Sequence, residues 1–476
     1  MDMDICACRT LGELKSAGWH SRSVREELRS NLAARIAAGE TILPGLQGYE
    51  DTVIPEIENA VLSGHHVVLL GERGQGKSRL LRGLVELLDE YTPAIAGCEL
   101  HCDPFKPICS ACRRRAASEG DALAVSAVPR EDRYFEKLAT PDVAMADLIG
   151  EVDPIKVAEG RHLADEDAIH FGLVPRAHRG IFAINELPDL MEKIQVGLFN
   201  LMEERDIQIR GFAVRLPVDV LVVASANPED YTSRGRIITP LKDRFDARIR
   251  THYPRALEVE MSILDQEVSV AARDGRAIRV PGFLEAIVAR ATFEAREAPE
   301  VNQRSGVSVR VSINNYETLV ANAERRALRC GESEIVPRIS DLPAVAASML
   351  GKLEWEYGVE EEGEEEKILE RLLGRAVKTI FDETLDPDAL GEISDWFEQG
   401  GGVEVSDQMP SAEYQEAVEG IPGMRAALES FGPFESPALV ASAVEFVLEG
   451  LHLHERLNKE ADGTRVAVQR YGASGS

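Results

Sequence analysis

A phosphate-binding loop is the clearest chemical signal in the sequence. The eight residues from Gly71 to Ser78 match the pattern G-x-x-x-x-G-K-[ST] at every fixed position. Glycines let backbone N–H groups curl around phosphate oxygens, and the positive end of the following helix adds to the attraction. Lys77 would neutralise the β- and γ-phosphates, and the Ser78 hydroxyl would ligate Mg²⁺. We expect ATP with Mg²⁺ to bind Gly71, Glu72, Arg73, Gly74, Gln75, Gly76, Lys77 and Ser78.

A second polar pair follows an apolar run further along the chain. A phosphate-loop enzyme needs acidic groups at a neighbouring strand end, to hold the metal's water shell and to polarise the attacking water. Glu186 is placed to orient or deprotonate that water. Asn185 stands where an aspartate is usual; its amide can bind a metal-bound water but adds no charge, so metal affinity and turnover are both expected to be weaker. The alternative is a structural strand end with a capping asparagine and a surface glutamate.

Four cysteines form the third chemical group, at Cys98, Cys102, Cys109 and Cys112. Four thiolates satisfy tetrahedral zinc, and the closing C-x-x-C fits the tight turn of such sites. His101 could replace one ligand. An iron–sulfur cluster and a set of reduced thiols stay open as alternatives. A zinc ion or an iron–sulfur cluster at this site would hold a loop in place rather than catalyse a reaction, because four protein ligands leave no open coordination position.

Apolar runs and amphipathic segments alternate through residues 40–250, and the elements that they predict could position these groups. Three short apolar runs, Val67–Leu70, Gly180–Ile184 and Asp219–Ala224, are typical of buried parallel strands. The first run precedes the phosphate loop, and an apolar face over Leu80–Leu88 predicts a helix after it. This context favours a nucleotide site over a glycine-rich turn that matches by chance. The expected fold class is α/β, with a parallel-sheet P-loop core, an all-α lid and an acidic helical carboxy-terminal region.

Further motifs follow in a fixed order. They are Asp147–Asp153, Gly160, Gly172–Glu186, Leu201–Arg205, Ile207–Gly211, Ala224–Pro228 and Leu241–Phe245. In this order the chain resembles AAA+ ATPases of the magnesium-chelatase I-subunit and MoxR group, over roughly residues 40–330. The alternating segment Asp206–Leu216 is typical of a β-hairpin, and the resemblance implies that this hairpin stands near the pore of a ring.

The resemblance also implies roles for matching side chains. Asn227 resembles the sensor-1 residue, which positions the attacking water near the γ-phosphate. Arg244 resembles the arginine finger, which reaches the ATP of the neighbouring subunit. Arg310 resembles the sensor-2 arginine of the lid, and Gly48 and Tyr49 fall where the family lines its adenine pocket. Three other arginines compete for the trans-acting role: Arg234, Arg236 and Arg248.

The function that this resemblance implies is an ATP-dependent remodelling or chaperone-like ATPase. It would be a homo-oligomer, a hexameric ring, that hydrolyses ATP at subunit interfaces and acts on a protein partner with a von Willebrand A-type domain. Three alternatives stay open. One is a nucleotide-gated scaffold with little turnover, which Asn185 favours; the second is a true magnesium-chelatase ATPase subunit; the third is a DNA-translocating motor. The cysteine cluster and the segment beyond residue 341 depart from the family pattern.

Charge is distributed unevenly along the chain. The 53 basic and 82 acidic side chains give a net charge of -29. Residues 341–476 hold 10 basic and 29 acidic side chains, so most of the excess lies there. The negative net charge disfavours binding to nucleic-acid phosphates, although the core could still carry a local basic pore. No run approaches the roughly 20 apolar residues that span a bilayer, and no leader is evident, so we expect no membrane association and a cytoplasmic protein.

These patterns divide the chain into four expected segments. Residues 1–40 form an amino-terminal helical segment, and 41–252 form the ATPase domain, with a cysteine-rich insertion at about 96–116. Residues 253–345 form the helical lid, and 346–476 an acidic, mostly helical region. Within the last segment we expect a charged linker or exposed helix start at Glu360–Glu366, a flexible loop at Gln399–Val403, and a frayed carboxy-terminal end.

Overall fold

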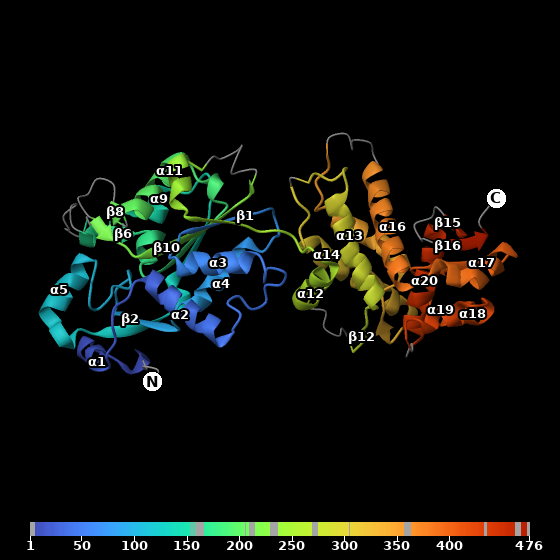
Figure 1. Ribbon diagram of the computed structural model, residues 1–476, viewed down its shortest axis with the longest axis horizontal. Helices are drawn as coiled ribbons and strands as arrows, with labels where there is room; N and C mark the ends of the chain where they lie inside the picture. Colours follow the sequence, from blue (N-terminus) through green and yellow to red (C-terminus); the bar gives the residue numbers. More distant parts are fainter. Residues whose placement is uncertain are drawn as a thin grey trace. The chain divides into compact units, whose positions relative to one another are not determined.

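The computed structural model divides the 476-residue chain into two compact units, residues 1–252 and 253–476 (Figure 1). The structure describes residues 5–473 except for a set of short segments. These are 154, 156–157, 159–165, 205, 209–214, 229–236, 269–274, 304, 357–362, 433–435 and 462–467. Each unit has its own apolar core.

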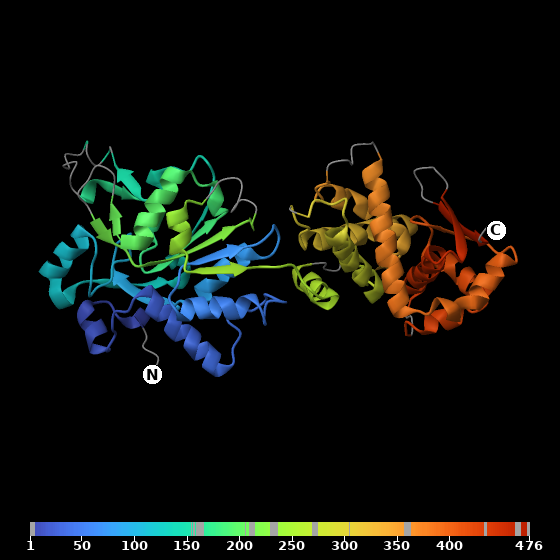
Figure 2. The same ribbon diagram turned by 45° about the horizontal axis from the view of Figure 1, so that its top comes forward.

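The first unit is built on a five-stranded parallel sheet (Figure 2). Its strand order is β11-β1-β10-β7-β4, and every neighbouring pair is parallel. The strands are β1 (Val67–Leu70), β4 (Tyr134–Leu138), β7 (Gly180–Asn185), β10 (Val220–Ala226) and β11 (Ala247–Arg250). The three predicted apolar runs are the three central strands, and the α/β fold class is confirmed.

Helices cover both faces of this sheet, which explains why its central strands are apolar throughout. Val67 and Leu69 pack against α2 (Val24–Ala38), α3 (Val53–Leu62) and α4 (Lys77–Gly83). Val68 and Leu70 belong to the core on the opposite face, with α9 (Glu192–Glu204) and α11 (Thr239–Arg244). Strand residues alternate between the two faces, so each face is filled by every second side chain.

Shorter elements complete the first unit. The helices and 3-10 turns are η1 (Ile5–Ala7), α1 (Leu11–Ser16), η2 (Leu84–Leu87), α5 (Ser110–Glu119), η3 (Gly120–Ala122), η4 (Arg130–Arg133), α6 (Met145–Leu148), η5 (Glu166–Ala168), α8 (Leu173–Arg176) and η6 (Leu187–Asp189). The antiparallel strand pairs are β2 (Tyr91–Ile95) with β3 (Val125–Pro129), β5 (Gly150–Val152) with β6 (Ile169–Phe171), and β8 (Asp206–Gln208) with β9 (Arg215–Pro217). The last pair forms at the predicted hairpin, whose residues 209–214 lie outside the described part of the chain.

The amino-terminal segment belongs to the first unit. Thr10 and Ser23 cap α1 and α2, each with a glutamate three residues later that completes a capping box. Glu27 of α2 accepts hydrogen bonds from the Arg133 guanidinium at 2.8 and 2.6 Å and from the Asp89 N–H at 2.7 Å. Glu27 and Arg133 are both buried. A buried ion pair therefore holds α2 against η4, at the start of β4.

We expect Glu27→Gln to destabilise the first unit by about 3–5 kcal/mol, because it leaves the buried guanidinium of Arg133 uncompensated. For a unit of this size, that cost corresponds to a fall in Tm of roughly 6–20 °C, measurable by calorimetry. The control is Asp121→Asn, which breaks the exposed ion pair with Lys15 and should change stability by about 1 kcal/mol at most. Equal shifts in the two variants would contradict the role given to the buried pair.

The second unit is mainly helical. Its helices and 3-10 turns are α12 (Leu257–Glu267), α13 (Gly282–Glu297), α14 (Arg310–Cys330), η7 (Ile339–Val345), α15 (Ala346–Leu350), α16 (Glu364–Thr384), η8 (Pro387–Leu390), α17 (Gly391–Glu398), η9 (Ser411–Glu413), α18 (Tyr414–Gly420), α19 (Met424–Glu429) and α20 (Pro437–Leu453). Two short strands, β12 (Ala277–Ile278) and β13 (Glu334–Ile335), pair in parallel. A three-stranded antiparallel sheet contains β14 (Val403–Ser406), β16 (Val468–Ala473) and β15 (Leu457–Ala461), in that order.

The lid and the acidic region share one core, which extends from Leu264 to Tyr471. Buried polar contacts also join them. The Ser340 N–H donates to the buried Glu445 carboxylate at 2.7 Å, and Arg338 donates to the Met409 carbonyl at 2.8 Å. The predicted boundary between residues 345 and 346 is therefore not a break in the core.

The expectation of a frayed carboxy-terminal end is wrong for residues 468–473. Residues Val468–Ala473 form β16, the central strand of the antiparallel sheet, and Tyr471 is fully buried. The acidic run does supply a helix start, since α16 begins at Glu364 with three glutamates in its first turn, where the helix dipole favours negative charge. No helix in the described part of the chain combines the length and the apolar character needed to cross a membrane.

Candidate nucleotide-binding site

The phosphate loop joins the carboxyl end of β1 to α4. Gly74 and Gly76 have φ of +76° and +70°, a left-handed conformation that side chains disfavour. A Cβ atom at Gly71 would lie 1.8 Å from Thr251 Oγ1 and 2.2 Å from Gln75 Oε1, so only glycine fits there. The loop thus has the backbone freedom and the close approach that wrapping around phosphates requires.

Lys77 is buried inside the loop and donates to three oxygens. Its Nζ lies 2.5 Å from the Gly71 carbonyl, 2.8 Å from the Glu72 carbonyl and 3.0 Å from Asn227 Oδ1. An ammonium group has three N–H donors, so Lys77 can make these three contacts at once. The structure therefore brings Lys77 and Asn227 together, as the predicted roles of both residues require.

Gln75 and Tyr49 support the loop. Gln75 Oε1 accepts from the Glu72 N–H at 3.1 Å and from the Thr251 hydroxyl at 2.7 Å. The Tyr49 hydroxyl lies 2.7 Å from the Gln75 carbonyl and 2.8 Å from the His252 carbonyl, and burial raises its pKa to about 12. Tyr49 thus connects the loop to the end of β11, and its neighbour Gly48 has a φ of +80°. The adenine-pocket role of both residues stays a prediction.

Glu186 lies where β7 ends and has a left-handed backbone conformation, with φ 53° and ψ 48°. Such values are uncommon outside glycine and often occur at functional sites. Ser225 Oγ accepts from the Glu186 N–H at 3.2 Å, and Asn227 Nδ2 donates to Glu186 Oε2 at 3.1 Å. A continuous polar chain therefore connects Lys77, Asn227 and Glu186 across β1, β10 and β7.

Asn185 occupies the strand end just before Glu186. Its Oδ1 lies 3.3 Å from the Ser78 hydroxyl, so the two predicted magnesium ligands are adjacent. Its Nδ2 donates to Glu136 Oε1 at 2.5 Å. Glu136 is on the neighbouring strand β4, and hydrogen bonding and charge from Arg82 hold the pKa of its carboxyl below the usual range. The sequence did not identify Glu136 or Arg82, because their role depends on a pairing of β4 with β7 that no motif marks.

Arg244 ends α11 and is partly exposed. Its guanidinium pairs with Glu203 of α9 and lies 5.5 Å from the centre of the Phe199 ring. Nε is buried without a hydrogen-bond partner among the described residues. Of its competitors, Arg248 is exposed on β11 and donates to the Lys242 carbonyl at 3.0 Å, whereas Arg234 and Arg236 lie outside the described residues.

Arg310 is in the second unit, at the first position of α14, and is exposed. Its backbone N–H donates to Ser308 Oγ at 3.1 Å. Because the phosphate loop is in the other unit, the sensor-2 role of Arg310 stays a prediction. Gly160, one of the motif residues, lies outside the described residues.

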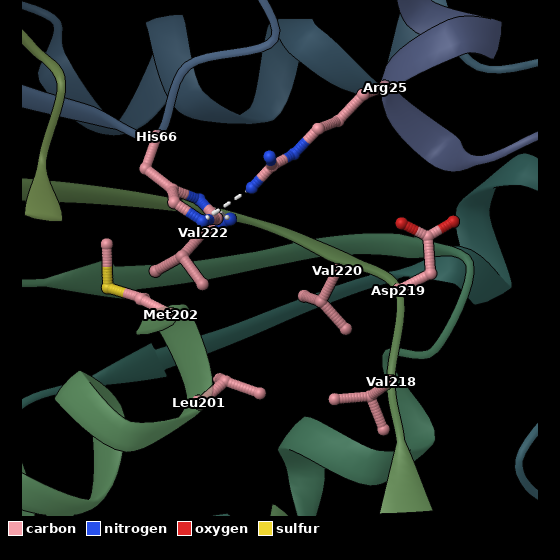
Figure 3. A pocket seen from close by; sticks show the side chains of 8 residues that line it. All are labelled: Arg25, His66, Leu201, Met202, Val218, Asp219, Val220 and Val222. Carbon is pink, nitrogen blue, oxygen red and sulfur yellow. Dashed lines mark hydrogen bonds between the residues drawn. The ribbon is translucent and has the colours of Figure 1, made fainter. Parts of the chain in front are cut away.

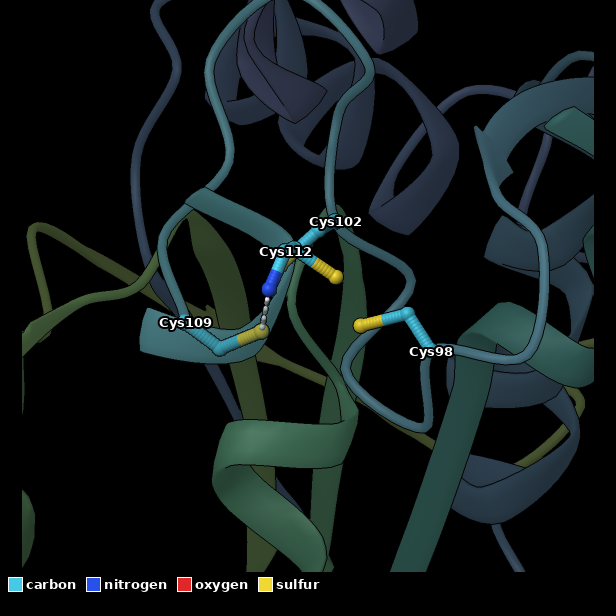
Figure 4. A group of neighbouring side chains, drawn as sticks. All are labelled: Cys98, Cys102, Cys109 and Cys112. Atoms are coloured by element: carbon cyan, nitrogen blue, oxygen red, sulfur yellow. Dashed lines mark hydrogen bonds between the residues drawn. The ribbon is translucent and has the colours of Figure 1, made fainter. Parts of the chain in front are cut away.

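The four cysteines converge in one cluster (Figure 4). Their sulfur atoms all lie within 4.8 Å of one another, and Cys102, Cys109 and Cys112 are buried. Cys109 caps α5, and its sulfur accepts from the Cys112 N–H at 3.3 Å. Hydrogen bonds from the other thiols lower the pKa of Cys98 below its usual range. Among the described residues, His101 is not part of this group.

The cluster lies in the connection between β2 and β3, within the predicted insertion. Cys102, Cys109 and Cys112 belong to the same apolar core as Val68 of β1 and Phe182 of β7. The insertion is therefore packed onto the sheet that carries the phosphate loop.

A small pocket opens at the end of the sheet opposite to the phosphate loop (Figure 3). His66 and Asp219 directly precede β1 and β10, so the pocket lies at the amino ends of the strands. Arg25 of α2 approaches His66 Nε2 to 2.7 Å, and His66 Nδ1 lies 3.0 Å from the Val222 nitrogen. These contacts connect α2 to the sheet at the edge away from the phosphate loop.

Several known proteins are similar to this chain. A family model described as the Sigma-54 interaction domain matches residues 159–245. The magnesium-chelatase 38 kDa subunit of Acidiphilium rubrum is 31% identical over 203 residues, which are 42% of this chain and 54% of that protein. The magnesium-chelatase subunit ChlI of a Nostoc species is 26% identical over 238 residues, 49% of this chain and 59% of that protein. The chain thus spans between half and two thirds of the length of these curated relatives.

A solved complex between the BchI and BchD subunits of magnesium chelatase is similar at 22% identity and a TM-score of 0.36, covering 66% of this chain and 97% of that one. The phosphate loop, the polar chain through Lys77, Asn227 and Glu186, and the sequence relatives agree with one another. Over 42–49% of its length, the chain is therefore similar to subunits of magnesium chelatase, ChlI among them.

Proposed function

We propose that the protein hydrolyses ATP at the interfaces between identical subunits of a hexameric ring, and uses the energy to remodel a protein partner. The observation that carries this proposal is the polar chain of Lys77, Asn227 and Glu186. In this chain Lys77 supplies a cation for the phosphates, whereas Asn227 and Glu186 supply an amide and a carboxylate for the attacking water. Hydrolysis of a phosphoanhydride uses these groups.

On binding of ATP, Lys77 would exchange its present oxygen partners for β- and γ-phosphate oxygens. Ser78 and Asn185 would hold Mg²⁺ and its water shell; the ion, when bound, neutralises charge on the phosphates. Asn227 would lose Lys77 as a partner and remain bonded to Glu186, which orients the carboxylate. Glu186 would then align the attacking water and accept its proton.

Arg244 would act on the ATP of the adjacent subunit. Its place at the end of α11 and its partial exposure support this role, because a trans-acting group must be accessible at the subunit surface. A guanidinium stabilises the negative charge that spreads over the transferring phosphoryl group. Pairing with Glu203 and packing on Phe199 would hold the side chain in place before assembly.

The protein partner would carry a von Willebrand A-type domain, as the shared order of motifs suggests, and the acidic second unit offers a docking surface for it. A true magnesium-chelatase subunit is a narrower form of the same proposal, and the two curated relatives favour it. A cytoplasmic location fits both forms.

A nucleotide-gated scaffold is the second candidate, because Asn185 brings no charge to the metal site. Two measurements on the purified protein separate the candidates: ATP binding by calorimetry and phosphate release in the presence of Mg²⁺. Binding with sustained release supports the ATPase. Binding without release supports the scaffold and refutes the proposed hydrolysis.

We also propose that the cysteine cluster binds one zinc ion. Zn–S bonds of about 2.3 Å place tetrahedral thiolates about 3.8 Å apart, and the sulfur separations of up to 4.8 Å are compatible with that geometry. An iron–sulfur cluster contains several metal atoms and needs its thiolates further apart, so a single ion fits better. Zinc bound by four thiolates would secure the insertion against the sheet core.

Metal analysis should find about one zinc ion per chain in protein purified without chelator. Cys109→Ser is expected to lose the zinc and to lower Tm, because structural zinc contributes directly to folding free energy. Cys330→Ser is the control, since Cys330 belongs to the second unit and is not one of the four clustered cysteines. Zinc far below one equivalent in the wild type, or equal Tm values for both variants, would count against the site.

A further inference from the structure

The amide of Asn185 is held in one orientation by its neighbours. Its Oδ1 accepts from the hydroxyls of Ser78 at 3.3 Å and Ser225 at 3.2 Å, whereas its Nδ2 donates to Glu136 at 2.5 Å. An ionised carboxylate only accepts hydrogen bonds, so Glu136 selects the NH₂ end of the amide. The carbonyl end of Asn185 is therefore directed toward Ser78, the other residue expected at Mg²⁺.

Glu136 is itself fixed by the helix that follows the phosphate loop. Arg82 donates to both carboxylate oxygens, at 2.7 and 2.9 Å. Arg82 comes four residues after Ser78 on α4, so the two side chains lie on the same face of that helix. The contacts Ser78–Asn185–Glu136–Arg82 form a closed circuit that begins and ends on α4. Glu136 therefore connects the helix that presents Ser78 to the strand that presents Asn185.

We propose that Glu136 is a positioning residue for magnesium, supplying through the Asn185 amide the negative charge that an aspartate at position 185 would supply directly. The inference rests on the proposed function, because it takes Mg²⁺ with ATP as the ligand. A carboxylate that accepts from an amide N–H polarises the amide, and the carbonyl oxygen becomes a stronger acceptor for a metal-bound water. Asn185 and Glu136 together thus replace one aspartate.

A purely structural role for the Arg82–Glu136 pair predicts a different outcome. The two side chains are 64% and 21% exposed, and exposed ion pairs contribute little to stability. Glu136→Gln should therefore fold like the wild type. If the pair only joined α4 to β4, this variant would leave the Mg²⁺ dependence of nucleotide binding unchanged.

Three variants test the inference. Glu136→Gln removes the charge and lets the two amides pair in either orientation, so Mg²⁺ affinity should fall about 10–100-fold. Asn185→Asp places two carboxylates within hydrogen-bonding distance, and their repulsion should prevent any gain in affinity. The double variant E136Q/N185D moves the single charge to position 185 and should recover most of the lost affinity, a coupling that independent residues would not show.

The measurement is calorimetric binding of a non-hydrolysable ATP analogue to the full chain over a series of Mg²⁺ concentrations. Glu131→Gln, an exposed glutamate just before β4, is the control and should match the wild type. A wild-type Mg²⁺ dependence in Glu136→Gln, or a double variant as weak as that single variant, would overturn the inference. The readout is binding, so a wild-type protein that binds Mg²⁺ with ATP but releases no phosphate refutes the proposed hydrolysis and not this inference.

Discussion

Glu186→Gln is expected to lower kcat for ATP hydrolysis by about 10²–10⁴-fold, with ATP affinity unchanged. Glutamine has the same size, and its amide oxygen can still accept from Asn227, as Glu186 Oε2 does at 3.1 Å. The variant therefore loses the negative charge and the proton-accepting oxygen but keeps the polar chain. Phosphate release and nucleotide titration, measured on the same protein, separate the two effects.

The control for this variant is Glu192→Gln, which removes the same charge from an exposed position on α9. It should leave both kcat and affinity at the wild-type values. An unchanged kcat in Glu186→Gln would mean that another group aligns the water. A parallel loss of ATP affinity would mean that Glu186 supports the loop rather than the chemistry.

Arg244→Ala is expected to lower kcat by about 10³–10⁵-fold, the range in which trans-acting arginines contribute to phosphoryl transfer. The variant should still bind ATP, because the phosphate loop of its own chain is intact. Truncation also leaves Glu203 and Phe199 without this partner, but the pair is partly exposed and its loss should change stability little.

Arg248→Ala provides a matched control for the arginine. Arg248 is exposed on β11 and contacts the Lys242 carbonyl, so its loss should leave the rate near that of the wild type. A large loss of kcat in Arg248→Ala together with a small loss of kcat in Arg244→Ala would assign the trans-acting role to Arg248 instead.

The sequence predicted the central strands and the phosphate loop because both depend on local patterns. Four-residue apolar runs and a glycine-rich loop before an amphipathic helix are visible without knowledge of the fold. The cysteine spacing was informative for the same reason. The burial of these cysteines in the core with β1 and β7 was not predictable, since that packing depends on where the insertion folds back onto the sheet.

Other features depend on contacts between distant segments. Glu136 reaches Asn185 only because β4 pairs with β7, and Glu27 meets Arg133 only because α2 packs beside η4. The carboxy-terminal end was predicted to fray, yet β16 is held between β14 and β15. Tertiary pairing of this kind overrides local propensity.

One measurement tests the central claim most directly: phosphate release by mixtures of Lys77→Ala and Arg244→Ala chains. Each variant alone should be nearly inactive. In a mixed ring, an Arg244→Ala chain keeps an intact phosphate loop and receives Arg244 from a neighbouring Lys77→Ala chain, so its site is complete. The account predicts release by the mixture well above the sum of the two separate proteins, with a maximum at intermediate ratios. Release that stays at that sum at every ratio would contradict hydrolysis at subunit interfaces.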